Sequence, residues 1–443
     1  VTVSNAHDLA QLKAINNATG GTITLNDASV ALSGSAADIT AALTGISGYT
    51  GAVTASGTQT GSAGVTAVNA LGTATAGVVT ATVSGTAAEL ASLTTAGTDM
   101  IAVTVSNAHD LAQLKAINNA TGGAITLNDA SVALSGSAAD IAAALAGISG
   151  YTGAVTASGT QTGSSGVTAV NTLGAATTGV VTATASGTAA ELASLSTAGT
   201  DLIAVTLSDA HDLAQLKAIN NATGGTITLN SYSVGLSGTN SDLNEALAGN
   251  FGASYAGALT VSGAVTIAQL TALTSKTSGS VNYTSISDLA DNIVANNGSG
   301  LSSFITSNKT VNIKDQVTLA QLKAINDGTT GAITLDVTTG ALSGSAADLT
   351  AAFSGTITEY TGTLTVSDTA DLAQAEVIKG ATSGTSTYTV ADAANTISTA
   401  AGSATQVLAL QNATSVTVNA SALQTEIDMA GFAGSKAMAL TIN

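Results

Sequence analysis

A 21-residue segment that recurs almost unchanged every 102 residues constrains this chain more than any other feature. Three copies lie at Val1–Gly21, Val103–Gly123 and Val205–Gly225. The second copy is identical to the first, and the third differs only at Leu207 and Asp209. Near-identical tandem copies indicate an array in which each unit buries its apolar face on its neighbours. We therefore expect a repetitive body and not one large globular core.

The repeat defines four predicted domains. They are residues 1–102, residues 103–204, residues 205–314 with a degenerate second half, and residues 315–443, a degenerate terminal copy. The last copy keeps LAQLKAIN at Leu319–Asn326. Each copy divides into four smaller units of about 25 residues, in which a β-rich run precedes a helical pattern. Examples are Val1–Leu12, Val30–Leu43 and Ala81–Leu93.

These patterns predict an α/β solenoid of stacked strand–helix units with a parallel sheet. Consecutive strands joined by helices lie parallel and cross over with a right hand. The segment Thr22–Gly51 is longer than the other units and is expected to contain an extra strand. Alternating Val-Thr-Val favours the strands. Asn17–Gly21 ends with glycine, the usual helix terminator.

Acidic and apolar residues at fixed positions support the predicted helices. Three acidic residues are expected in first turns, where the helix dipole favours them: Asp8, Asp38 and Glu89. One apolar stripe per long helix is expected to pack on the sheet: Leu9, Leu12 and Ile15, with their copies.

The composition limits the function classes. The 443 residues include 27 acidic residues and nine lysines, which give a net charge of −18, and they include no Cys, Pro or Trp. This charge disfavours nucleic acid and anionic membranes as partners. No apolar run approaches the roughly 20 residues that a membrane-spanning helix needs, so no membrane insertion is predicted. Without Cys, disulfides and thiolate metal sites are excluded.

The three histidines, His7, His109 and His211, occupy one position of the repeat, and each precedes an Asp. Successive copies are four units apart, about 20 Å at the spacing of paired strands, so they cannot share a metal ion. No distinctive partner marks any of them as catalytic. We expect each to be a surface residue in the first turn of a helix.

The acidic segments offer weak candidates for calcium ligands, because calcium prefers oxygen ligands. The candidates are Asp27, Asp129, Asp288 and Asp291. Neither an EF-hand loop nor the glycine–aspartate nonapeptide of calcium-binding β-rolls occurs. Caps and turns are the simpler interpretation of these residues, so no cofactor is predicted beyond this calcium.

No catalytic pattern stands out, and we expect the protein not to be an enzyme. The segment Gly61–Gly64 is glycine-rich but lacks the lysine that a Walker motif requires, so it is interpreted as a turn. An enzyme acting on polysaccharide would need clustered carboxylates in one cleft, and the spacing does not indicate them.

Both ends of the sequence read as strands, which lack charged residues and proline. The predicted assembly edges are Val1, Thr2 and Val3 at one end and Leu440, Thr441 and Ile442 at the other. Open strands recruit partners. A head-to-tail contact between copies of the chain would be heterologous and would produce a filament. Fragment ends of a longer repeat protein are the alternative interpretation.

Three phrases resemble units of very large, acidic, secreted repeat proteins of bacteria, of the kind found in cyanobacterial surface layers, sheaths and fibres. They are Val366–Gln374, Thr387–Ile397 and Ser343–Phe353. The resemblance implies a secreted protein located outside the cell or on its surface.

The leading functional hypothesis is a structural subunit of a fibre, sheath or surface layer that assembles end to end with copies of itself. The alternative is an adhesin stalk or a carbohydrate-binding module that contacts cell-surface polysaccharide. Exposed Thr, Asn and Tyr side chains, among them Tyr49 and Tyr151, would line such a binding face.

Overall fold

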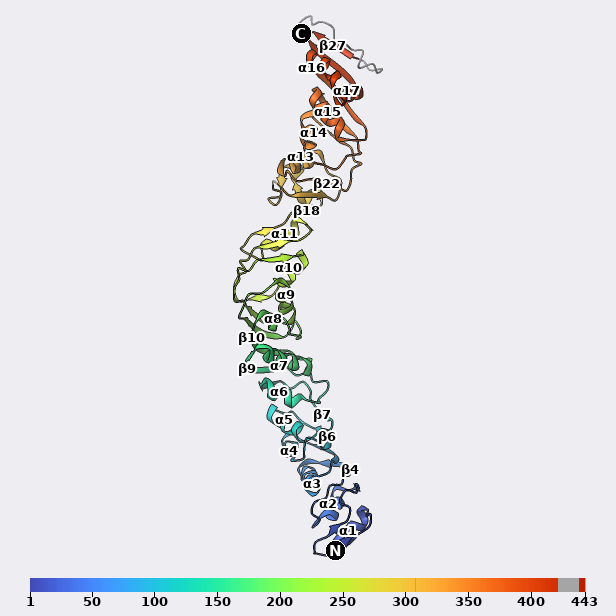
Figure 1. Cartoon of the computed structure of the whole chain (residues 1–443), viewed down its shortest axis with the longest axis vertical. Helices are drawn as coiled ribbons and strands as arrows, with labels where there is room; N and C mark the ends of the chain where they lie inside the picture. Colours follow the sequence, from blue (N-terminus) through green and yellow to red (C-terminus); the bar gives the residue numbers. More distant parts are fainter. Residues whose placement is uncertain (307, 421–437, 443) are drawn as a thin grey trace. The chain divides into compact units, whose positions relative to one another are not determined.

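The computed structural model describes residues 1–306, 308–420 and 438–442, in which helices and strands alternate along the chain (Figure 1). The chain divides into two compact bodies. We call residues 1–234 and 245–254 the N-terminal body, and residues 235–244 and 255–443 the C-terminal body. In the described residues every strand pair is parallel except β19 (Val294–Ala295) with β20 (Gly300–Leu301). The predicted α/β alternation with parallel sheets is confirmed.

The N-terminal body contains thirteen of the described strands and nine of the helices. Its strands are β1 (Thr2–Val3), β2 (Thr24–Leu25), β3 (Leu32–Gly34), β4 (Val53–Thr60), β5 (Val79–Gly85), β6 (Met100–Val105), β7 (Ile125–Leu127), β8 (Leu134–Ser137), β9 (Val155–Thr162), β10 (Val181–Gly187), β11 (Leu202–Leu207), β12 (Thr226–Thr228) and β14 (Asn250–Phe251). Its helices are α1 (Leu9–Ala18), α2 (Ala36–Leu43), α3 (Gly61–Ala74), α4 (Ala87–Leu90), α5 (Leu111–Asn119), α6 (Ala138–Leu145), α7 (Gly163–Ala176), α8 (Ala189–Leu192) and α9 (Leu213–Ala222). The division between the bodies falls within α10 (Asn240–Ala246).

The C-terminal body follows the same alternation. Its other strands are β13 (Leu236–Gly238), β15 (Leu259–Val261), β16 (Ala264–Val265), β17 (Val281–Asn282), β18 (Ser285–Asp288), β21 (Thr310–Ile313), β22 (Ile333–Leu335), β23 (Leu342–Gly344), β24 (Leu364–Ala370), β25 (Ser386–Ala393), β26 (Ser415–Ala420) and β27 (Met438–Ile442). Its helices are α11 (Ile267–Thr274), α12 (Ala290–Ile293), α13 (Leu319–Gly328), α14 (Ala346–Ala352), α15 (Leu372–Ala381), α16 (Ala394–Thr399) and α17 (Ala404–Asn412), with 3-10 turns at Asn296–Gly298 and Ala400–Gly402. None of the described helices is both long and apolar enough to cross a membrane.

Two sheets dominate the N-terminal body, with strand orders β3-β4-β5-β6-β7 and β14-β12-β11-β10-β9-β8. Residues paired in register lie one strand–helix unit apart: Thr80 pairs with Met100, and Val53 pairs with Val79. The long unit at Thr22–Gly51 contains the predicted extra strand, because β2 and β3 both lie within it. Each large sheet starts at such an extra strand, β3 or β8.

The core consists of small aliphatic side chains that alternate with exposed polar ones. In β5, Val79, Ala81 and Val83 are buried, whereas Thr80 and Thr82 are exposed. This period of two is expected for a sheet that carries helices on one face only. The sheet therefore has a helix-covered face and an open outer face.

The predicted apolar stripe is buried only in part. Leu12 and its copies Leu114 and Leu216 are fully buried, and so are Ile117 and Ile219, the copies of Ile15. Leu9, its copies and Ile15 itself are half-buried. The Leu9 side chain lies over Gly34, where an added Cβ would approach Leu9 Cδ2 to 2.4 Å. Glycine at this position therefore leaves room for the leucine of the neighbouring helix.

The helix starts match the sequence except at Asp8. Asp8 precedes the first turn as the N-cap of α1, and its carboxylate accepts from Gln11 N at 2.8 Å. The prediction that placed it inside the first turn is wrong by one residue, because its backbone is extended. Asp38 and Glu89 do lie in first turns, as predicted.

Candidate functional site

The contacts between neighbouring strand–helix units form the most regular polar feature of the described residues. The first set is a buried Thr followed two residues later by Gly, in the turn after a helix. Thr121 Oγ1 donates to Ile101 O at 2.7 Å and accepts from Ile101 N at 2.9 Å and Gly123 N at 2.8 Å. The hydroxyl therefore joins its own turn to the strand of the preceding unit.

The same Thr-x-Gly contact recurs in both bodies. Its threonines are all at most 9% exposed: Thr75, Thr121, Thr177, Thr223, Thr277, Thr329 and Thr382. Each hydroxyl donates to a backbone carbonyl about one unit earlier in the chain. Sequence analysis missed this role. The Thr-x-Gly triplet after each helix is the signal that could have shown it.

A second set of contacts caps helices across units. Asn107 Oδ1 accepts from Ala87 N at 2.8 Å, and Asp209 Oδ1 accepts from Ala189 N at 2.7 Å. These side chains satisfy a free N–H at the start of a helix in the preceding unit. Further acceptors of this kind are Asp288, Asp315, Asp368 and Asp392.

A third set holds the end of one helix to the next. The side-chain amide of Asn118 in α5 donates to Ala144 O of α6 at 3.1 Å, and Asn16 makes the same contact to Ala42 O at 3.3 Å. Carbonyls of the last turn have no partner within their own helix, so these amides satisfy them. The three sets together connect neighbouring units through polar side chains in both bodies.

Two aspartates that the sequence did not single out are buried between units. Asp99 is 5% exposed, and its two carboxylate oxygens accept from Val79 N and Ala96 N, each at 2.8 Å. Asp201 repeats this arrangement with Val181 N and Ala198 N. Backbone donors therefore compensate for the burial of each carboxylate.

Lysine–acid pairs lie on the helix side of the units, where they are exposed. Lys13 pairs with Asp38, and Lys115 pairs with Asp140. The hydrogen bond from Lys115 is the largest of the causes that lower the pKa of Asp140. Exposed pairs of this kind contribute little to stability, so they do not fix the stacking of the units.

The prediction for the histidines is wrong. His7, His109 and His211 are 6%, 5% and 4% exposed, and each lies one residue before the N-cap of its helix, outside the first turn. His109 packs on Tyr151 with ring centroids 6.1 Å apart, and its Nε2 lies 3.5 Å from the Tyr151 hydroxyl. Burial lowers the pKa of His109.

The tyrosines proposed for a carbohydrate face are buried as well. Tyr49 is 2% exposed and Tyr151 is 1% exposed. Their hydroxyls donate to Val30 O and Val132 O, and burial raises the pKa of Tyr151 to about 12. These two rings therefore cannot act as surface platforms for sugars, and the expectation that they are exposed is wrong.

The four calcium candidates act in hydrogen bonds within the protein. Asp27 and Asp129 each accept from the backbone and the hydroxyl of the serine two residues later. Asp288 is 6% exposed and accepts from Ile267 N and Leu289 N, and Asp291 accepts from Gln321 Nε2. In the described part of the chain, no three acidic or histidine side chains gather as a metal site would require.

The predicted assembly edges are strands. In β1, Thr2 and Val3 pair with β2, and the amino group of Val1 donates to Thr22 O at 2.8 Å. The backbone of β27 pairs in parallel with β26. The side chains of Leu440, Thr441 and Ile442 lie outside the described residues.

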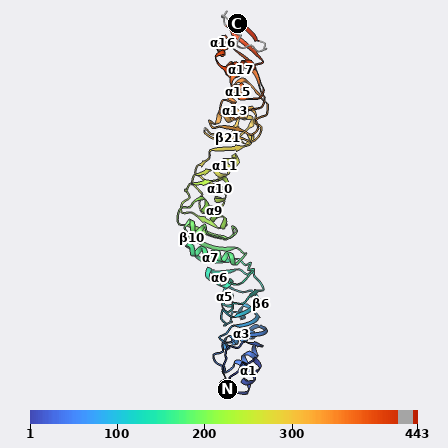
Figure 2. The ribbon, with the colours of Figure 1, turned by 45° about the vertical axis from the view of Figure 1, so that its right-hand side comes forward.

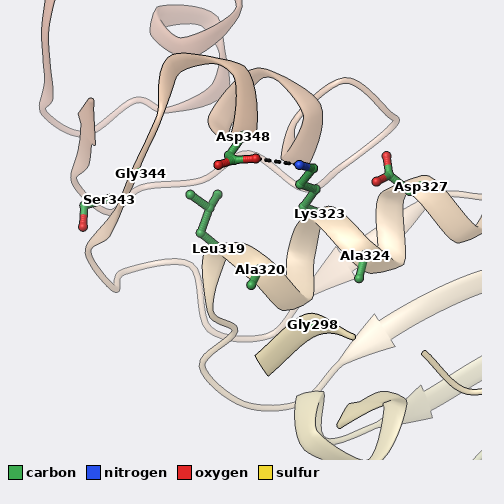
Figure 3. A pocket seen from close by; sticks show the side chains of 9 residues that line it. All are labelled: Gly298, Leu319, Ala320, Lys323, Ala324, Asp327, Ser343, Gly344 and Asp348. Atoms are coloured by element: carbon green, nitrogen blue, oxygen red, sulfur yellow. Dashed lines mark hydrogen bonds and ion pairs between the residues drawn. The ribbon is translucent and has the colours of Figure 1, made fainter. Parts of the chain in front are cut away.

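A surface hollow of about 460 Å³ lies beside α13 in the C-terminal body (Figure 3). Lys323 of α13 points toward Asp348 of α14 at its rim, and Leu319 forms an apolar wall. The lysine is already paired with this carboxylate, so the hollow offers no free cation and no nucleophile with an adjacent base.

Comparison with known proteins assigns no family and no function to this chain. No family model matches the chain, and no curated protein aligns with it significantly.

Proposed function

We propose that this protein is an extracellular structural repeat protein, a subunit of a fibre, sheath or surface layer. Its strand–helix units would form an α/β solenoid grouped in 102-residue repeats. The observation that carries the proposal is the repetition of one set of contacts between neighbouring units. Thr121 and Thr223, for example, make the same hydrogen bonds in successive copies of the repeat.

These contacts connect only residues about one unit apart. Asn69 Nδ2 donates to Ser92 O, 23 residues later, and Thr121 reaches back 20 residues to Ile101. A body held together by nearest-neighbour contacts can be lengthened by adding units without redesigning a core. Such a chain suits a spacer or a load-bearing element better than a catalyst, which needs residues from distant segments in one cleft.

Head-to-tail assembly through β1 and β27 remains part of the proposal. The parallel pairing that this contact would use already joins β6 to β7 inside the chain, through Val103–Val105 and Ile125–Leu127. The high net negative charge keeps the separate chains soluble before their edge strands meet.

Immunogold labelling of the source cells tests the function. An antibody raised against residues 1–102 is expected to label intact cells and elongated material at their surface. The same antibody, after absorption with the purified protein, provides the control. Labelling that appears only after the cells are ruptured would contradict an extracellular role.

A further inference from the structure

The outer faces of the two large sheets in the N-terminal body carry ordered hydroxyl groups. We call them the first and second Thr faces. The first consists of Ser33, Thr54, Thr58, Thr60, Thr80, Thr82, Ser84, Thr104 and Thr126. The second consists of Ser135, Thr156, Thr160, Thr162, Thr182, Thr184, Ser186, Thr206 and Thr228. The side chains of both faces are exposed or half-buried.

The strand registers align these residues in rows. Thr60 pairs with Ser84, Ser84 with Thr104, and Thr104 with Thr126, so one row crosses four strands. Neighbours in a row are about 4.8 Å apart, and neighbouring rows about 6.7 Å apart. Among the residues that the structure describes, none of these hydroxyls has a hydrogen-bond partner within the protein, so all are available to an external partner.

Exposed apolar side chains lie among the hydroxyls at matching positions of both faces. Met100, 50% exposed, is the register partner of Thr80, and Leu202, also 50% exposed, is the register partner of Thr182. Val78 and Val180, just before β5 and β10, are 43% and 39% exposed. Met100 with Val78, and Leu202 with Val180, therefore add exposed apolar area to each Thr face.

Both Thr faces are free of charge. None of the residues of the strands from β3 to β12 is acidic or basic. The lysine–acid pairs of this body lie on the helices instead. Two chains that each carry a net charge of −18 repel one another, and the absence of charge on the Thr faces weakens this repulsion locally.

We propose that the two Thr faces are lateral contact surfaces for a second copy of this chain, packed sheet on sheet. The rows of one face have the same spacing as the rows of another, so Thr methyl groups and Met100 or Leu202 can interdigitate across the roughly 10 Å that separates packed sheets. The inference rests on the proposed structural function and names its partner.

One Thr face is small, so a single contact between two chains would be weak and a layer would need several such contacts. Five strands about 4.8 Å apart and three rows about 6.7 Å apart cover roughly 480 Å². A standard interface buries about 800 Å² per partner, so a single face gives a weak contact. In Figures 1 and 2, β6 and β10 lie on different sides of this body. One chain can therefore contact two neighbours, and several weak contacts together hold a layer.

Sedimentation velocity of the full chain tests this contact. The variant Met100→Glu with Leu202→Glu places a charge on each face without altering the core, since both side chains are half exposed. Leu408→Glu, at an apolar residue of α17 that is 47% exposed, is the matched control. Thr82→Glu with Thr184→Glu is a second pair, used if the first loses its circular dichroism spectrum.

We expect the wild-type chain and the Leu408→Glu control to associate with rising concentration, and more strongly at high salt, which screens the net charge. The double variants are expected to associate at least about tenfold more weakly. A wild-type chain that remains monomeric, or double variants that associate as the wild type does, would overturn the proposal. Binding to insoluble neutral polysaccharide without self-association would overturn it as well. Labelling of the cell surface tests the extracellular location independently of these outcomes. A wild-type chain that remains monomeric would also contradict head-to-tail assembly, whereas double variants that associate as the wild type does would contradict only the lateral contact.

Discussion

Thr121→Val isolates the contribution of a buried hydroxyl that joins two units. Valine keeps the shape of threonine but accepts no hydrogen bond, so Ile101 N and Gly123 N lose their acceptor. Ile101 is fully buried, and its N–H cannot reach water instead. An unsatisfied buried N–H costs about 1–3 kcal/mol. Gly123 is half-buried and adds less, so we expect a total loss of about 2–4 kcal/mol.

Hydrogen exchange measures this loss where it occurs. Long repeat arrays do not always unfold in one step, so the free energy of one global transition would dilute a local effect. A local loss of 2 kcal/mol speeds exchange of the β6 amides by about 30-fold. We expect this acceleration at Val103 and its neighbours in β6, and much less in β10, which belongs to the other sheet.

Thr126→Val provides the matched control. It makes the same chemical change in β7, on an exposed residue whose hydroxyl has no partner among the described residues. We expect its effect to stay within about 0.5 kcal/mol. Equal losses for Thr121→Val and Thr126→Val would refute the reasoning, because they would show that the buried hydrogen bonds do not fix the units.

Three further predictions follow from the buried side chains. Leu114→Ala should destabilise its unit by about 2–5 kcal/mol, measured by hydrogen exchange of the amides around α5, whereas Leu408→Ala, on an exposed residue, should change little. Because burial lowers the pKa of His109 from its ordinary value of 6.5, the folded chain binds this proton less readily than the unfolded chain does, and stability should fall as the pH drops below about 6.5. An NMR titration of the ring should give a midpoint below 6.5, and His109→Phe should remove this part of the pH dependence. Asp99→Asn offers one side-chain oxygen where two backbone N–H groups need acceptors. It should therefore destabilise its unit by about 1–3 kcal/mol at neutral pH, measured by hydrogen exchange.

The sequence predicts the secondary structure of this chain well because the units are short and their signals are local. The alternation in Val79–Gly85 and the acidic residue Asp38 in the first turn of α2 depend on residues within one turn or one strand. The extra strand near Leu32 was also predictable, from unit length alone. A prediction of this kind needs no knowledge of what lies beside the unit.

The environment of the histidines was not predictable in this way. His109 is followed by Asp110, which suggests an exposed helix start, yet it is buried because Tyr151, 42 residues later, packs on it. The burial of Tyr49 and Tyr151 depends in turn on loops of the long unit. Residues separated by a unit or more are brought together by stacking, and no local pattern reports that.

The register of the stack is defined by the core and by buried polar side chains together. A slip by one residue would move Val79, Ala81 and Val83 from the core to the exposed face of β5. A slip by one residue would leave the buried hydroxyl of Thr121 without its partners at Ile101. Each such loss leaves unsatisfied backbone groups, which makes the correct register the favoured one.

The sequence differences between the second and third copies preserve both the aliphatic core and the polar contacts between units. Position 207 holds leucine where the previous copy has Val105, and both side chains are buried. Position 209 holds aspartate where the previous copy has Asn107, and both accept from the first N–H of a helix in the preceding unit. In the third copy, one buried aliphatic residue therefore replaces another, and one hydrogen-bond acceptor replaces another. If contacts between units are what the chain preserves, replacing Asp209 by leucine, which branches at the same atom but has no acceptor, should destabilise α8 more than replacing Leu207 by valine does.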